Sequence, residues 1–352
     1  MIEREEAIRG ALLGCAIGDA LGLPYENLSR HRATRLLGEP DRYRFFRGRG
    51  MVSDDTQHTW MTAQSLCEHP TDPEAFVRAL ARRFRWWLMG QPAGIGLATL
   101  KAIVKLWLGF SPKRSGVFSA GNGPAMRMAV LGAAIDDLST LHRFAEVSTR
   151  LTHTDPKALE GAFAIALAGW CARRGINDAN GFFDKYRTTP EANPSPEFAS
   201  LLQHVESDLL TGKTVEQFAE GLGCSKGVSG YIYRTVPVVL FAWLRHRGEF
   251  RPIVTDLIRC GGDTDTTAAI AGSIAGCGVG GSRLPSEWID GLWERPRSVA
   301  WSDQLANQLA EAISTQSPVR PMRTNPLAEA GRNLIFLGIV LGHVFRRGLP
   351  PY

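Results

Sequence analysis

Two short acidic runs carry the clearest chemical signal in this sequence. Residues 53–56 read Ser-Asp-Asp-Thr, and residues 263–266 read Asp-Thr-Asp-Thr directly after two glycines. Each run precedes a segment in which apolar residues recur at helical spacing. One acid at such a position can serve as a helix N-cap, where the helix dipole favours negative charge. Two acids flanked by two hydroxyls exceed what a cap needs, which indicates a second role.

Convergence of the two runs on divalent cations would explain both pairs of acids. All the candidate ligand atoms are oxygens, and neither run contains histidine or cysteine. Mg²⁺ or Mn²⁺ is therefore favoured over Zn²⁺. Four carboxylates balance two divalent ions better than one, and two such ions can orient substrate oxygens and activate a water molecule. An EF-hand is excluded because no loop with its spacing and terminal glutamate is present.

The chain that must position these acids is predicted to be helical almost throughout. Residues 5–21 combine apolar residues at helical spacing with small residues, and the segment after the second acidic run is rich in alanine and glycine. Alternating strand patterns joined by Asn-Gly or Asp-Gly turns are absent. We predict an all-α fold, a compact bundle of many helices. The expected helices are 5–21, 57–66, 73–88, 124–135, 141–150, 156–173, 196–210, 214–220, 231–245, 250–258, 267–276, 285–292 and 302–313, with loops at 90–96, 109–123, 187–196, 221–230 and 276–281.

The bulk composition is that of a globular protein in a reducing compartment. The 352 residues are 44% hydrophobic and 21% charged, with a net charge of +5, so neither disorder nor a nucleic-acid partner is favoured. The six cysteines form no Cys-x-x-Cys pair, and the charged N-terminus has no signal-peptide core. We therefore expect a cytoplasmic protein.

One domain, residues 1–316, is predicted, followed by a C-terminal extension, residues 317–352. The apolar run at 334–344 in this extension is much shorter than the roughly 20 residues that a membrane helix needs. We interpret it as a helix docked on the domain and expect no membrane partner. The sequence does not indicate an oligomeric state.

An arginine-rich segment lies between the first helix and the first acidic run. Residues 30–49 contain seven arginines against one glutamate and one aspartate. Such a segment could steer a polyanionic ligand such as a pyrophosphate, or it could be a solvated loop. The sequence leaves both interpretations open.

Five ordered motifs, spread over roughly residues 7–295, resemble those of the ADP-ribosylglycohydrolase family. They are Gly-Ala-Leu-Leu-Gly-Cys-Ala-Ile-Gly-Asp-Ala-Leu-Gly-Leu-Pro-Tyr-Glu at 10–26, the first acidic run, Gly-Asn-Gly-Pro-Ala-Met-Arg at 121–127, Thr-His-Thr-Asp-Pro at 152–156, and Gly-Gly-Asp-Thr-Asp-Thr at 261–266. The resemblance implies an orthogonal helical bundle with two Mg²⁺ or Mn²⁺ ions at the base of a cleft. It also implies hydrolysis of the N- or O-glycosidic bond between ADP-ribose and a target, which is a protein side chain such as arginine or a small molecule.

Matching the family's functional residues to positions in this sequence gives candidate metal ligands and catalytic residues. Family members often have threonine where this chain has Ser53, and its hydroxyl or carbonyl oxygen could serve either way. Glu26 matches a family acid that helps to handle the attacking water; the alternative is an exposed charge at a helix end. With it, Asp54 and Asp55 are the catalytic candidates. The metal candidates are Ser53, Asp54, Asp55, Asp263, Asp265 and Thr266.

Three further segments are substrate-binding candidates. Residues 121–123 precede a predicted helix, so their N–H groups could hold a pyrophosphate, or the segment could be a simple turn. The resemblance implies that His153 lies near the bound ligand, although a single histidine often has only a structural role. The loop at 227–231 resembles one that holds the nucleotide, with Tyr231 either stacking on adenine or lying in the core. The substrate-binding candidates are Gly121, Asn122, Gly123, His153, Ser229, Gly230 and Tyr231.

One departure from the family pattern leaves the cleaved linkage open. Many relatives carry Asp-Ile-Gly where residues 94–96 read Gly-Ile-Gly. That acid is thought to position the scissile group in some members, so arginine, serine and small-molecule linkages all remain candidates. Two rival functions also remain: an inactive relative that binds ADP-ribose or serves a structural role, and a metal hydrolase that acts on ADP-ribosylated nucleic acid. The presence of all four aspartates favours an active hydrolase.

Overall fold

Helices α1 (Arg4–Gly22) and α15 (Thr264–Val279) form the centre of the fold and pack with almost no space between their backbones. A Cβ atom added to Gly18 would lie 2.1 Å from the carbonyl oxygen of Ala268, a distance that no side chain tolerates. The small residues that recur in the sequence of α1 are therefore explained by this close helix contact. The glycines of α1 that face α15 are Gly10, Gly14, Gly18 and Gly22.

The antiparallel direction of this pair determines which segments meet. Gly10 lies against Gly276, and the Thr264 hydroxyl donates to the Gly22 carbonyl at 2.9 Å. The end of α1 therefore meets the start of α15. The start of α3 (Asp54–Glu68) lies beside the same end of α1, where the Ser53 N–H donates to Asp19. Both acidic runs are thus brought to one end of the central helix pair.

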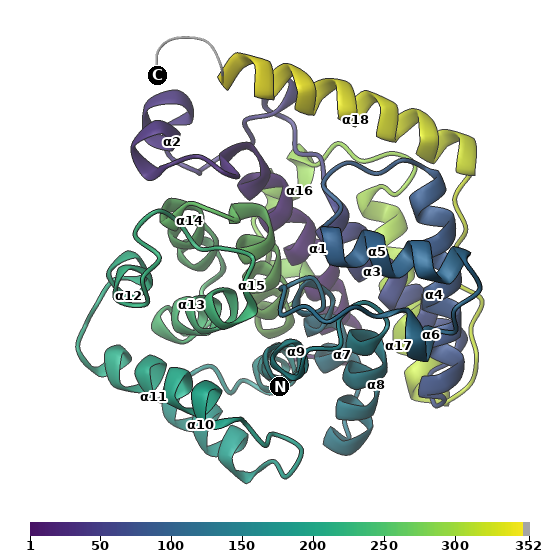
Figure 1. Cartoon of the computed structure of the whole chain (residues 1–352), viewed down its shortest axis with the longest axis horizontal. Helices are drawn as coiled ribbons and strands as arrows, with labels where there is room; N and C mark the ends of the chain where they lie inside the picture. Colours follow the sequence, from purple (N-terminus) through teal and green to yellow (C-terminus); the bar gives the residue numbers. More distant parts are fainter. Residues whose placement is uncertain (348–352) are drawn as a thin grey trace.

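The other helices surround this centre, and no strand occurs among residues 1–347, which are the residues that this computed structural model describes (Figure 1). The predicted all-α class is confirmed. The remaining helices are α2 (Arg30–Leu37), α4 (Pro73–Met89), α5 (Leu97–Trp107), α6 (Pro112–Ser115), α7 (Ala129–Ala134), α8 (Leu138–Arg150), α9 (Pro156–Arg173), α10 (Ala179–Thr188), α11 (Pro196–Leu210), α12 (Val215–Gly221), α13 (Ile232–Arg245), α14 (Phe250–Cys260), α16 (Ser286–Gly291), α17 (Val299–Thr315) and α18 (Pro326–Arg347), with 3₁₀ turns at Leu23–Tyr25, Phe46–Gly48, Ala125–Arg127 and Gly281–Arg283.

Several elements differ from the sequence prediction. Helices α2, α5 and α10 lie in segments for which no helix was expected, and the short α6 lies within the loop predicted at 109–123. The helix expected at 124–135 is a 3₁₀ turn followed by the short α7. The helix expected from residue 57 begins at Asp54, with Ser53 as its N-cap, so both acids of the first run occupy its first turn.

The C-terminal helix α18 lies across one side of the bundle, at the top of Figure 1. Phe336 packs with Leu23, Phe45 and Met51 in a small apolar cluster of its own. His343 bonds through Nε2 to the carbonyl oxygen of Pro24 at 2.9 Å. The helix therefore covers the segment that directly precedes Glu26. The domain boundary at residue 316 stays a prediction.

Among residues 1–347, two helices are long and apolar enough to cross a membrane, judged by length and composition alone. The first, Arg4–Tyr25, is 94% buried as the centre of the fold, and the second, Pro326–Arg346, is 17% buried. The expectation that no segment approaches such a length was wrong for both helices, because it considered only uninterrupted apolar runs such as the one at 334–344. The expected absence of a membrane partner stays a prediction. All six cysteines are buried and free.

Candidate metal and active site

The two acidic runs meet at the end of the central helix pair. Oxygen atoms of Glu26, Asp263 and Asp265 all lie within 4.8 Å of one another. The Thr266 hydroxyl donates to Asp55 Oδ2 at 3.3 Å, which joins the second run directly to the first. Five carboxylates, those of Glu26, Asp54, Asp55, Asp263 and Asp265, therefore gather where the starts of α3 and α15 meet the end of α1.

Asp55 shows most clearly that this cluster fits a cation. Its Oδ2 atom accepts from the Ser53 hydroxyl at 3.1 Å as well as from Thr266. Its Oδ1 atom is buried and has no hydrogen-bond partner. A buried carboxylate oxygen without a partner costs free energy unless something else compensates it. A divalent cation is the partner that this set of oxygen ligands favours.

The electrostatics of the cluster lead to the same conclusion. Burial, followed by the nearby Asp19 carboxylate, holds the pKa of Asp54 well above its usual range. The pKa of Asp55 is raised by burial and then by Asp54, and that of Asp265 by burial and then by Glu26. These carboxylates repel one another when ionised. Bound cations would reverse this effect and keep the carboxylates charged.

Asp19 supports the first acidic run, a role that sequence reasoning missed. It is fully buried in α1 and accepts from the Ser53 N–H at 2.9 Å and from the Thr56 hydroxyl at 2.5 Å. Burial raises its pKa to about 6, against the opposing effect of these hydrogen bonds. Asp19 therefore fixes the turn that opens α3. An acid within a helix of small apolar residues was the available signal.

Glu26 follows the 3₁₀ turn after α1 and is only partly exposed. Asn27 donates through Nδ2 to Glu26 Oε1 at 2.8 Å, and its backbone N–H donates to the Gly262 carbonyl at 2.8 Å. Asn27 thus ties the Glu26 segment to the second acidic loop. This position differs from that of an isolated helix-end charge. Asn27 was not among the predicted site residues.

Three glycine-containing loops form a wall beside the acids. The Asn122 N–H donates to the Gly230 carbonyl at 2.9 Å, and the Asp263 N–H donates to the Val228 carbonyl at 2.8 Å. Asn122 Nδ2 donates to Asp263 Oδ2 at 2.7 Å. The segments 121–123, 227–231 and 261–263 are therefore joined in one surface. Asn122 therefore positions the wall through both its backbone and its side chain, and the Gly121 N–H is also engaged, by the Ser119 hydroxyl at 3.3 Å.

His153 lies beneath this wall rather than on its open side. It is buried, and its Nδ1 bonds to the Thr152 hydroxyl at 2.9 Å. A Cβ atom added to Gly121 would lie 3.0 Å from His153 Nε2, so the glycine allows the close contact. Burial, then Arg127, lowers the pKa of His153 to about 3, which keeps the ring neutral. Buried Arg127 donates to the Gly123 carbonyl at 2.9 Å and fixes the same loop from below.

The nucleotide-side candidates lie at the start of α13. Ser229 is exposed, and Tyr231 is 36% exposed at the helix N-cap. Lys157 donates through Nζ to the Tyr231 hydroxyl at 3.1 Å. The alternative that Tyr231 is a core residue was therefore wrong, because its ring lies at the surface.

Gly94 borders the acidic cluster, as expected from its place in the sequence. It has φ +91°, and an added Cβ atom would lie 3.1 Å from Asp54 Oδ1. An aspartate there would place a further carboxyl group beside the cluster, on a backbone that side chains rarely adopt. This chain therefore lacks an acid at a position that contacts the site.

The arginine-rich segment is held by contacts within the protein. Arg30 pairs with Glu216 and Glu220, at 2.8 and 2.5 Å, and donates to the Cys260 carbonyl. Arg44 pairs with Asp41 at 3.0 Å. These contacts favour a structural role for part of the segment. The steering of a polyanion stays a prediction.

Comparison with known proteins agrees with the geometry of the site. A family model described as ADP-ribosylglycohydrolase matches residues 1–319. An uncharacterized protein of Archaeoglobus fulgidus is 33% identical, over 87% of this chain and 97% of its own length. The ADP-ribosyl-[dinitrogen reductase] glycohydrolase of Rhodospirillum rubrum is 28% identical over 80% of this chain and 89% of its own length. A solved ADP-ribosylglycohydrolase-related protein complex matches with TM-score 0.64 and 26% identity, over 88% of this chain and 98% of that chain.

Human ADP-ribosylhydrolase ARH3 is a further relative, 28% identical over 80% of this chain and 87% of its own length. The matched relatives therefore include named hydrolases from both a bacterium and an animal. The matched family residues end before α18 begins.

Proposed function

The chain belongs to the ADP-ribosylglycohydrolase family, and we propose that it is itself a cation-dependent hydrolase that releases ADP-ribose from a modified target. The buried, unpartnered Oδ1 atom of Asp55, within a cluster of five carboxylates, is the observation that carries this proposal. An ADP-ribose-binding relative without activity would need the glycine loops, but it would not need so costly a cluster.

The residues that would hold two Mg²⁺ or Mn²⁺ ions combine the two acidic runs. When bound, such ions supply positive charge that stabilises developing oxyanions and lowers the pKa of a coordinated water. Asp19 keeps the first run in place through its bonds to Ser53 and Thr56. The proposed ligands are Ser53, Asp54, Asp55, Asp263, Asp265 and Thr266.

Glu26 is the proposed general base. Its carboxylate lies within the cluster and is held by Asn27. It orients a water and accepts one of its protons as the water oxygen bonds to the anomeric carbon of the distal ribose. The bond from that carbon to the target nitrogen or oxygen breaks, its electron pair leaves with the target, and the proton is passed to the leaving atom.

The glycine wall is the proposed substrate surface. Gly121 and Gly123 would face the pyrophosphate, while Asn122, His153 and Arg127 hold the loop from behind. Tyr231, with its partly exposed ring, and the neighbouring Ser229 and Gly230 would meet the nucleotide end. The pyrophosphate and the scissile ribose would thus lie on adjoining surfaces of one cleft.

A substrate panel tests this proposal. Purified protein is incubated with Mg²⁺ and with arginine-linked, serine-linked and nucleic-acid-linked ADP-ribose, and free ADP-ribose is measured. We expect release from at least one protein linkage, and we expect its loss after chelation and in Asp55→Asn. Binding of ADP-ribose with no release from any substrate would instead identify an inactive relative. Because Gly94 supplies no acid to pair with a guanidinium, we expect the serine linkage to be preferred over the arginine linkage.

A further inference from the structure

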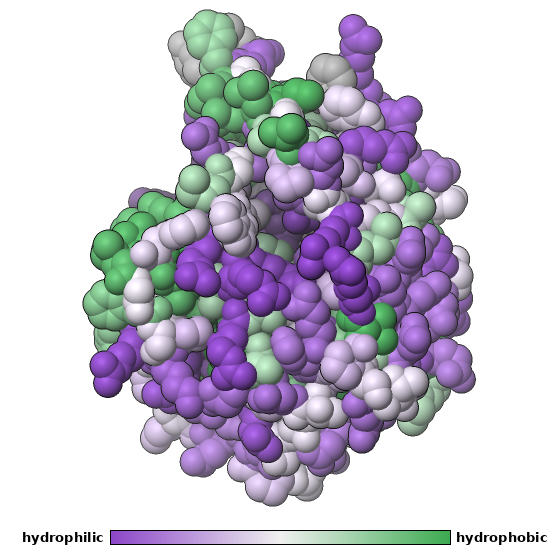
Figure 2. Space-filling view, turned by 90° about the vertical axis from the view of Figure 1, so that its right-hand side faces the viewer, coloured by the Kyte–Doolittle hydropathy of each residue, from purple (hydrophilic) through white to green (hydrophobic). Residues whose placement is uncertain are grey.

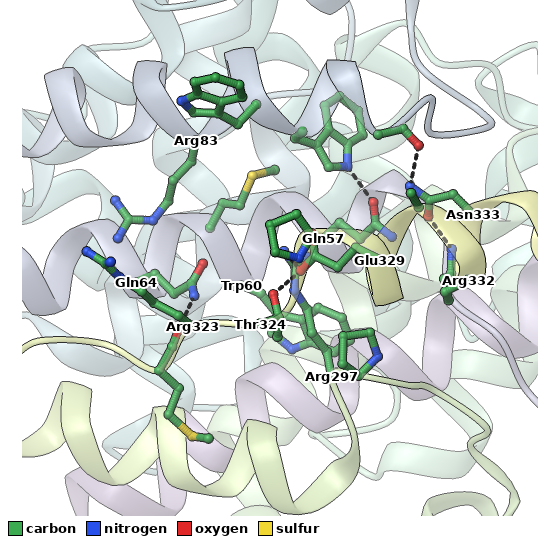
Figure 3. A pocket seen from close by; sticks show the side chains of 18 of the residues that line it. Gln57, Trp60, Gln64, Arg83, Arg297, Arg323, Thr324, Glu329, Arg332 and Asn333 are labelled. Atoms are coloured by element: carbon green, nitrogen blue, oxygen red, sulfur yellow. Dashed lines mark hydrogen bonds and ion pairs between the residues drawn. The ribbon is translucent and has the colours of Figure 1, made fainter.

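A cavity whose lining contains none of the clustered acids lies between α3, α4, residues 294–297 and the C-terminal segment that leads into α18 (Figure 3). Its volume is about 630 Å³, which lies within the range of about 300–1,000 Å³ that is typical of small-molecule sites. Its lining includes none of the metal, catalytic or substrate-binding candidates. Figure 2 shows this side of the molecule, and its surface is hollowed near the centre of the view.

The C-terminal segment builds one wall of this cavity. Nine of its 24 lining residues lie after residue 319, where the matched family residues end. Specific bonds fasten this wall to the domain: Gln64 donates to the Met322 carbonyl at 2.9 Å, and Asn333 donates to the Gly90 carbonyl at 2.7 Å. Arg332 donates through Nε to Glu294 at 2.9 Å. The cavity is therefore a built feature of this chain.

The lining carries a net positive charge. Its six arginines exceed its three glutamates, and each glutamate is already paired. Glu68 pairs with Arg82 and Arg83, Glu294 with Arg332, and Glu329 with Arg297. Within residues 1–347, the two other arginines, Arg295 and Arg323, form no ion pair. A concave surface with an excess of one charge attracts ligands of the opposite charge.

Aromatic side chains and free donors complete the lining. Trp86 is 65% exposed, so its ring is open to a ligand, and Trp60 is buried at 2%. The Trp60 indole N–H and the Nε atom of Arg297 are both buried without a hydrogen-bond partner. In Figure 3, Arg83 and Arg323 lie toward the left of the view, and Trp60 and Arg297 lie nearer its centre. Buried donors without a protein partner are rare in native proteins, and a bound water or ligand can satisfy them.

From these features, we propose that the cavity is a second binding site, distinct from the hydrolytic one, for a small anion that carries an aromatic ring, of the nucleotide class. The phosphate would bind the unpaired guanidinium groups of Arg295 and Arg323, and the ring would stack on Trp86. The size of the cavity matches one small molecule. A nucleic acid or an acidic protein segment would instead spread over a larger surface.

A ligand series tests the proposal on the full-length protein. AMP, adenosine and inorganic phosphate are titrated while the fluorescence of the tryptophans is followed, and affinities are checked by calorimetry. AMP should bind more tightly than either of its two parts, because only AMP uses both the arginines and Trp86. Trp86→Leu should weaken the binding of AMP and of adenosine, and it should leave the affinity for phosphate unchanged.

Matched variants assign the binding to this cavity. Arg295→Ala with Arg323→Ala should weaken AMP about tenfold or more, since two charge-assisted contacts are removed. Arg320→Ala is the control, because Arg320 is exposed on the same segment and does not line the cavity. AMP binding should persist in Tyr231→Ala, which alters the nucleotide surface proposed for the hydrolytic site. No AMP binding at millimolar concentration, or an affinity that the arginine double variant leaves unchanged, would overturn the proposal.

Discussion

The acidic cluster and the arginine-lined cavity are built in opposite ways. The acids are positioned by backbones, because glycine contacts between α1 and α15 leave no room for adjustment where the helix ends meet. The cavity is held by side-chain ion pairs and by a segment that lies outside the matched family residues. A cluster of like charges needs a rigid frame, because its members repel. The cavity depends on pairing between side chains, and one of these pairs holds the residue before the first acidic run: Glu294 accepts from the Val52 N–H at 2.7 Å, and Arg332 donates to the Val52 carbonyl.

The largest effect should come from removing two acids at the start of α15. Asp263→Asn with Asp265→Asn should reduce hydrolysis to the uncatalysed rate and abolish the stabilisation of the fold by Mn²⁺. That stabilisation should reach about 2.7 kcal/mol in the wild type at 100 times the dissociation constant. Melting temperatures with and without Mn²⁺ measure it. If Mn²⁺ still raises the melting temperature of the double variant, Asp263 and Asp265 are not the ligands of the stabilising ions.

Glu26→Gln should have the next largest effect. Turnover should fall roughly 10²–10⁴-fold, the usual scale for a general base, while ADP-ribose binding is kept. Single-turnover rates and calorimetry distinguish these two quantities. Lost binding with normal turnover of bound substrate would make Glu26 a positioning residue.

Gly18→Ala tests the close packing of α1 against α15. The added methyl group would meet the Ala268 carbonyl, so the free energy of unfolding should fall by about 1–3 kcal/mol. Gly331→Ala is the matched control, because Gly331 lies in helix α18 with open space around it. That change should be neutral or slightly stabilising. Denaturant unfolding compares the two, and equal effects would contradict the close-packing argument.

The smallest effect is expected at Gly94. Gly94→Asp should raise the ratio of arginine-linked to serine-linked hydrolysis by a few fold, through a charge-assisted contact with the guanidinium. Gly94→Asn imposes the same strain at φ +91° without the charge, so it is the control. If Gly94→Asp and Gly94→Asn show the same ratio of arginine-linked to serine-linked hydrolysis, a charge at residue 94 does not determine which linkage is cleaved.

Local signals in the sequence predicted much of the fold and of the acidic cluster. Acid pairs at helix starts and regularly spaced small residues are short-range patterns, the meeting of the two runs was inferred from the acid pairs themselves, and the family resemblance supported it. The acid in a small-residue helix marked Asp19 as unusual, but its role was missed because its partners lie in a turn 34 residues away in the chain. Helix α10 was missed because an Asn-Gly pair in its first turn is typical of turns. Helix α5 was missed because Leu97 and Val104 give it exposed apolar residues, which blur the helical period.

The arginine-lined cavity had no signature in the sequence. Its lining residues come from four separate stretches of the chain, and their common location depends on where residues 321–333 pack. The net charge of the whole chain does not reveal that arginines are concentrated in one cavity. Only the packing of the C-terminal segment against α3 and α4 shows it.

The binding of Mn²⁺ to the wild type and to Asp55→Asn tests the central claim most directly. Free Mn²⁺ is followed by electron paramagnetic resonance as the protein is titrated, with Arg323→Ala as a control outside the cluster. The account predicts saturable binding of two ions per chain, which is lost or strongly weakened in Asp55→Asn and unchanged in Arg323→Ala. Absence of saturable binding to the wild type, or equal binding in Asp55→Asn, would contradict it.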